Sequence, residues 1–241
     1  MRAAEVEREA RAALDRGDDA EACRRLEALL HEQPAAYPQR CLLGFIHQQA
    51  GRLGEARAAY EAARAIAPPS PELQQNLGQV YLRLGEAGLA VQAYEAALRL
   101  APEAPELLDA LAAAHQAAGD LPGALACYER ILQRDPRHVP AFVGMAEAFA
   151  DHGWVDDARR SLETALTLAP DHLPALNLMG VLHLRAGRYT EAACCFERAV
   201  AARPGDAGLL RNLAMTRAAQ GEHAACGALC DAALAPRALP R

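Results

Sequence analysis

The sequence predicts an all-α solenoid built from seven helix-turn-helix units, and three recurring features predict it. A glycine returns every 34 residues without insertion or deletion, at Gly17, Gly51, Gly85, Gly119, Gly153, Gly187 and Gly221. The residue seven places before each glycine is small, namely Ala10, Gly44, Gly78, Ala112, Ala146, Gly180 and Ala214. A proline closes six of the units, at Pro34, Pro68, Pro102, Pro136, Pro170 and Pro204. No unit can bury its apolar stripe alone, so the copies must stack on one another.

The segment 71–104 shows why each unit forms two helices. Ser70 precedes Pro71, and a serine before a proline at the first helical position is a helix-start signal. Leu77 and Tyr81 are four residues apart, so they share one helical face. Gly85 then ends the first helix, because glycine tolerates the left-handed conformation found just past helix ends.

The pattern L-G-x-x-Y, a turn glycine, A-x-x-x-F/Y and a closing proline is similar to the tetratricopeptide repeat, here in a bacterial-type array. The resemblance implies a single array over residues 1–241, a right-handed superhelix of fourteen antiparallel helices. Its repeats fall at about residues 3–36, 37–70, 71–104, 105–138, 139–172, 173–206 and 207–238, with a short proline-containing tail at 235–241. The family's first-helix tryptophan is replaced by Gln74, Leu108, Phe142, Leu176 and Leu210.

Composition narrows the class of partner and the compartment. The net charge of −6 argues against nucleic acid, which favours a basic surface. The opening MRAAEVEREA is too charged for a signal peptide, and no apolar run reaches the roughly 18 residues of a membrane span. Seven scattered cysteines suit a reducing compartment. We therefore expect a cytoplasmic protein without membrane insertion.

The first helix, at about residues 2–16, alternates acidic and basic side chains. Its expected role is a solvating cap on the stack, because terminal repeats of solenoids have a polar outer face. A docking helix for a charged partner is the alternative.

First-helix positions that point away from the buried stripe line the concave groove in this family. The resemblance therefore implies a peptide-binding groove that includes Phe45, Gln48, Gln75, Asn76, Gln79, Leu82 and Gln116. Amide side chains both donate and accept hydrogen bonds, which suits an extended peptide with unpaired backbone groups. The other interpretation, a solvated polar helix face, is also open because glutamine is a good helix former.

Later repeats contribute Asn177, Val181 and Leu184 to the same implied groove. This part is more apolar, so a partner helix could bind there. Asn76, Asn177 and Asn212 also resemble, less regularly, the asparagine ladder of protein-glycosylating transferases. The family's two-carboxylate clamp for chaperone tails is absent, because the units on either side of Asn76 offer Cys41, Phe45, Glu106 and Ala110 at the clamp positions.

Histidines and cysteines favour packing over metal binding. His47, His115 and His183 share one register in alternate repeats, and His138 and His172 share another at an inter-repeat turn. They are interpreted as packing residues with a polar edge. His223, Cys226 and Cys230 could begin a zinc site, but no paired C-x-x-C motifs accompany them. The two cysteines are interpreted as small core residues.

The sequence therefore predicts a non-catalytic scaffold that binds a peptide or helix of a partner protein, with no cofactor and no metal. No phosphate loop, nucleophile elbow, zinc-protease signature or dinucleotide fingerprint is present. The alternative is the targeting or regulatory module of a larger enzyme, such as a sulfotransferase, methyltransferase or glycosyltransferase. The outward face of the last helix (Ala224, Gly227, Ala228 and Asp231) is small and flat, which predicts self-association or an appended domain there.

Overall fold

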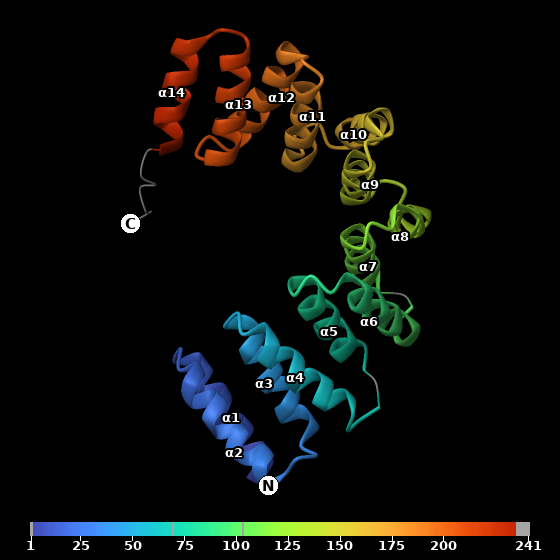
Figure 1. Cartoon of the computed structure of the whole chain (residues 1–241), viewed down its shortest axis with the longest axis vertical. Coiled ribbons are helices and arrows are strands. Elements are labelled where there is room, and N and C mark those ends of the chain that lie inside the picture. The colour runs from blue at the N-terminus through green and yellow to red at the C-terminus, as the bar shows by residue number, and fades with distance from the viewer. Residues whose placement is uncertain (1, 69, 103, 235–241) are drawn as a thin grey trace. The chain divides into compact units, whose positions relative to one another are not determined.

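The computed structural model describes residues 2–68, 70–102 and 104–234, and every regular element in these residues is an α-helix (Figure 1). The helices are α1 (Arg2–Asp15), α2 (Asp19–Glu32), α3 (Tyr37–Gln49), α4 (Leu53–Arg64), α5 (Pro71–Arg83), α6 (Ala87–Leu100), α7 (Pro105–Ala117), α8 (Leu121–Arg134), α9 (Val139–Asp151), α10 (Val155–Leu168), α11 (Leu173–Arg185), α12 (Tyr189–Ala202), α13 (Ala207–Ala219) and α14 (His223–Leu234). Each predicted unit is a helix pair, so the all-α solenoid is confirmed. The predicted tail at 235–241 lies outside the described residues.

The chain divides into two compact units, Met1–Cys127 and Tyr128–Arg241. In the first, α1 packs on α2, α3 on α4 and α5 on α6, and each second helix contacts the first helix of the next repeat. In the second, the pairs are α9 with α10, α11 with α12 and α13 with α14. First helices of neighbouring repeats also touch: α5 contacts α3 and α7, and α11 contacts α9 and α13. The first helices α3, α5 and α7 therefore form one layer in the first unit, and α9, α11 and α13 form one in the second.

The recurring glycines end the first helices as predicted. Gly51 and Gly85 have φ of 74° and 78°, and the other five glycines of the series are likewise positive. This conformation lets the next residue close the helix, because the Glu86 amide donates to the Tyr81 carbonyl at 2.8 Å. A side chain at these positions would strain the turn.

The small residue seven places before the turn allows the two helices of one repeat to approach closely. A Cβ atom added at Gly44 or Gly78 would lie 2.7 Å from the ring of Tyr60 or Tyr94, respectively. Both rings are almost fully buried. The glycines therefore provide the space in which an aromatic ring of the second helix packs.

The helix starts confirm one prediction and correct another. The Ser70 hydroxyl accepts a hydrogen bond from the Leu73 amide at 3.1 Å, as the start signal predicts. His138 and His172 were interpreted as packing residues, but they cap helices. Each Nδ1 accepts from a first-turn amide, of Ala141 at 3.3 Å and of Ala175 at 3.4 Å.

The last repeat departs from the prediction for its cysteines. Cys230 is exposed and Cys226 is only partly buried, so the interpretation of both as core residues is wrong. Within residues 2–234 that are described, the His, Cys, Asp and Glu side chains form no group of three that could hold a metal ion. Ala224, Gly227, Ala228 and Asp231 are all exposed, as expected for the outward face of α14.

Candidate peptide-binding surface

The implied groove residues of the first unit lie on the layer of first helices. We call this set the amide surface: Phe45 and Gln48 on α3, Gln75, Asn76, Gln79 and Leu82 on α5, and Gln116 on α7. Phe45 is 46% exposed, which is unusual for a phenylalanine. The three α5 amides, Leu82 and Gln116 are partly exposed. The surface thus offers amides beside one large apolar side chain.

Gln48 differs from the other amides because it is buried, with 7% exposure. Its Nε2 donates to Gln79 Oε1 at 3.0 Å, and its Oε1 accepts from the Tyr60 hydroxyl at 3.1 Å. Burial raises the pKa of the Tyr60 phenol, so the hydroxyl keeps its proton and remains a donor. Gln48 therefore holds Gln79 in place from below and leaves the Gln79 amino group for other partners.

The second unit has a recess at the amide pair on its first helices. Asn212 Nδ2 donates to Asn177 Oδ1 at 2.9 Å. The pair borders a recess of about 320 Å³ between α11 and α13, which is also lined by Arg203, Asp206 and Arg211. Asp206 is occupied as the cap of α13, since it accepts from the Gly208 amide at 2.9 Å and the Leu209 amide at 3.2 Å. The guanidinium groups of Arg203 and Arg211 can donate hydrogen bonds to a bound peptide.

The apolar groove residues that the sequence predicted in the later repeats are more buried than expected. Val181 and Leu184 are partly buried and pack against the cluster of Phe196 and Leu213. Met215 on α13 is 55% exposed and was missed by the sequence reasoning. It lies six residues before the turn glycine, the register of Phe45 and Val181, so extending the register into the last repeat would have found it.

The described residues include no helix long and apolar enough to span a bilayer.

The comparisons with known proteins establish the family. The tetratricopeptide-repeat profile matches residues 76–139, 110–172, 143–207 and 177–240, and a second profile of the same description matches residues 35–103. These matches cover most of the chain, which therefore belongs to the tetratricopeptide-repeat family. Proteins of this family generally act as non-catalytic scaffolds for other proteins. No curated protein sequence matches the chain significantly.

Solved structures share the fold. A tetratricopeptide repeat protein from Parabacteroides merdae superposes with a TM-score of 0.80 at 22% identity, over 96% of this chain and 91% of that one. A thermophilic protein of the family from Thermus thermophilus gives 0.58 at 25% identity, over 75% and 98% of the two chains. YrrB, a repeat protein with an unusual peptide-binding site, gives 0.53 at 18% identity, over 74% and 92%.

Proposed function

We propose that this protein is a non-catalytic scaffold that binds a peptide segment of a partner protein on its layer of first helices. The observation that carries the proposal is the half-exposed Phe45 beside the amide surface. An apolar anchor next to groups that both donate and accept hydrogen bonds is what an extended peptide requires. The recess at Asn177 and Asn212 offers the same chemistry in the second unit.

The location of the amides supports an extended peptide over a helical one for the first unit. A helix has satisfied its own backbone groups and would bind through apolar contacts, whereas an extended segment has amides and carbonyls to pair. Phe45 is the only large apolar side chain of the amide surface that is more than a third exposed. The second unit has an exposed apolar side chain of its own, Met215, which can contact an apolar side chain of a peptide bound to that unit.

All seven cysteines are free, which supports a reducing compartment, and we extend the proposal to a cytoplasmic protein.

Capture from the source cell with a variant of the amide surface tests the proposal. The variant carries Phe45→Ala, Asn76→Ala and Gln79→Ala. The control carries Leu100→Ala, Gln133→Ala and Thr167→Ala, three exposed positions on second helices. A partner that binds the parent and the control but not the folded amide-surface variant supports the proposal. Equal capture by all three proteins contradicts it.

A second candidate function follows from the exposed face of α14. This face has no covering element among the described residues, so an appended enzyme domain or a second copy could pack there, as in a targeting or regulatory module. Light scattering of the parent and of a Gly227→Arg variant tests self-association. A parent dimer that the variant converts to a monomer supports a second copy, and a parent monomer contradicts it.

A further inference from the structure

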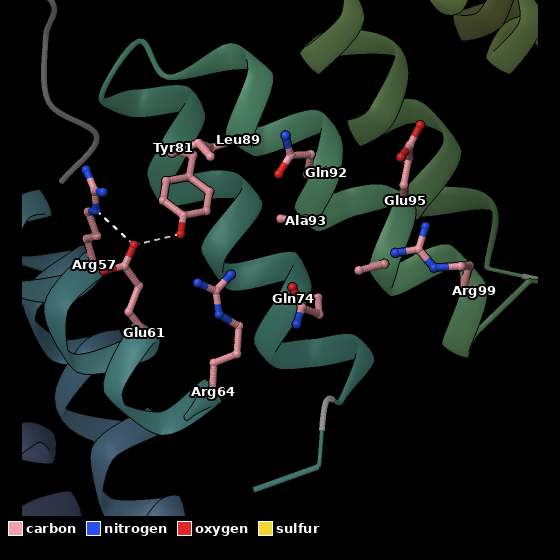
Figure 2. Close-up of a pocket in the computed structure, with 11 residues that line it drawn as sticks. Arg57, Glu61, Arg64, Gln74, Tyr81, Leu89, Gln92, Ala93, Glu95 and Arg99 are labelled. Carbon is pink, nitrogen blue, oxygen red and sulfur yellow. Dashed lines mark hydrogen bonds and ion pairs between the residues drawn. The ribbon is translucent and has the colours of Figure 1, made fainter. Parts of the chain in front are cut away.

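The second-helix side of the first unit contains a cavity that the proposed peptide surface does not use. It has a volume of about 470 Å³, and its walls come from α4, α5 and α6 (Figure 2). Arg57, Glu61 and Arg64 line it from α4, and Gln92, Glu95 and Arg99 line it from α6. Gln74 and Tyr81 contribute the flank of α5, which is the side opposite to the amide surface.

Gln74 is the most unusual residue of this cavity. The residue is only 5% exposed, and its side-chain amide forms no hydrogen bond with any residue that the structure describes. Its amide atoms are not among the fully buried polar atoms without a partner, so they face the open space of the cavity, where a ligand can reach them. In Figure 2 Gln74 lies between Arg64 and Arg99. An unpaired amide that lines a cavity between two guanidinium groups indicates a ligand that supplies the missing hydrogen bonds.

The repeats themselves show that this polarity is not required for folding. The position of Arg64 is apolar in the six other repeats, where Leu30, Leu98, Leu132, Leu166, Val200 and Leu234 stand. The position of Gln74 is also apolar in five of the six others, at Val6, Leu108, Phe142, Leu176 and Leu210. Where both positions are apolar, as in Leu166 and Leu176, the two side chains belong to one packed cluster. Arg64 and Gln74 replace that apolar contact with a polar cavity.

One wall of the cavity is fixed by a network of its own. Glu61 Oε1 accepts from the Tyr81 hydroxyl at 2.8 Å and from Arg57 Nε at 3.0 Å. A second nitrogen of Arg57 donates to Glu86 at 2.7 Å, so Arg57 is neutralised by two acids. These bonds occupy the Arg57 side of the cavity and leave the Arg64 and Arg99 side for a ligand.

The charged side chains that line the cavity indicate which class of ligand binds there. Arg64 and Arg99 form no hydrogen bond or ion pair with any described residue. Three arginines and two glutamates line the cavity, so its walls carry one net positive charge. Guanidinium groups bind carboxylates through short, charge-assisted hydrogen bonds. We infer that this cavity binds a single carboxylate of a peptide, held by Arg64, Arg99 and the Gln74 amide, at a site separate from the amide surface.

A titration followed by NMR tests the inference with defined probes. N-acetyl-glutamic acid amide supplies a side-chain carboxylate, N-acetyl-leucine supplies a chain-terminal one, and N-acetyl-glutamine amide is the neutral control. We expect saturable shifts of the Nε–H signals of Arg64 and Arg99 and of the Gln74 amino group. The dissociation constant should be on the order of 1 mM for such small probes. The tighter of the two acids identifies the source of the carboxylate. Binding of the neutral control as tightly as the acids, or of inorganic phosphate more tightly, overturns the inference.

Two variants separate a binding role from a structural one. Gln74→Leu introduces the leucine that three other repeats carry at this position, so the melting temperature should stay the same or rise. The same change should weaken carboxylate binding about tenfold. Arg64→Gln should abolish the saturable shifts.

A double variant of two exposed arginines outside the cavity, Arg16→Gln with Arg130→Gln, is the control, because it lowers the net charge without touching the site. Unchanged binding in Gln74→Leu, or equal weakening in the double variant, contradicts the site. None of these substitutions lies on the amide surface, so failure here leaves the proposed peptide binding intact.

Discussion

Gly78→Ala should destabilise the protein although alanine is the better helix former. The added Cβ would lie 2.7 Å from Cζ of Tyr94 and 2.8 Å from two further ring carbons, whereas ordinary carbon contacts are about 3.5–4.0 Å. Tyr94 is 1% exposed, so its ring has no open space to move into. Overpacking costs about 1–3 kcal/mol, and the gain in helix propensity returns about 1 kcal/mol. The net loss should be about 0–2 kcal/mol.

The internal repeats provide the compensating substitution. Glycine at this position faces an aromatic residue in Gly44–Tyr60, Gly78–Tyr94 and Gly180–Phe196, whereas alanine accompanies leucine in Ala10–Leu26 and Ala146–Leu162. Tyr128 follows Ala112 but packs its ring against Gly144 of the next repeat. Gly78→Ala should therefore cost less in a Tyr94→Leu background, with a coupling free energy of about 1–3 kcal/mol.

Urea denaturation followed by far-UV circular dichroism measures the free energy of unfolding of the four proteins in this double-mutant cycle. They are the parent, Gly78→Ala, Tyr94→Leu and the double variant. The m-values must agree before free energies are compared, because repeat arrays can unfold in several steps. Gly227→Ala is the matched control, since nothing lies within 4 Å of a Cβ there and the residue is exposed in α14. It should stabilise by about 1 kcal/mol or less. A cycle that is additive within about 0.5 kcal/mol would refute the steric explanation.

Three further predictions concern stability. Burial lowers the pKa of His183, with the charge of Arg188 in second place, and its Nδ1 is buried without a partner among the described residues. The unfolded chain then binds the proton more readily, so stability should fall as the pH drops below about 6.5, and His183→Phe should reduce this loss in urea titrations from pH 7 to 5. Tyr60→Phe leaves Gln48 Oε1 without its donor and should cost about 1–2 kcal/mol, and an unchanged denaturation midpoint would contradict the anchoring role of this bond. Asp206→Ala removes the cap of α13 and should cost about 1 kcal/mol, with faster exchange of the Leu209 amide as the local readout.

The helical architecture could be predicted because each repeat carries its own local signals. The turn glycines require a left-handed backbone, the serine before Pro71 caps a helix, and small residues allow two helices to approach. These are short-range requirements that recur at a fixed spacing. The exposed side chain of Phe45 also followed, because the register of one repeat fixes which face a residue occupies.

The state of individual site residues could not be predicted in the same way. Gln48 and Gln75 are both glutamines on first helices, yet only Gln48 is buried, because Tyr60 of the same repeat and Gln79 of the next one satisfy its amide. His138 and His172 looked like packing residues, and only the helix geometry shows that they cap. The role of Gln48 depends on atoms from two other helices, whereas each histidine caps the helix that directly follows it.

The sequence alone therefore determined the helix pairs, their turns and the general division of the helices into buried and outward faces, because a fixed period repeats the same local physics. Only the tertiary structure decided which polar side chains satisfy one another and which remain open. Arg64 and Gln74 belong to different repeats, and the cavity that they line exists because α4, α5 and α6 meet there. A cavity depends on distances between helices, and residue spacing along the chain does not encode those distances.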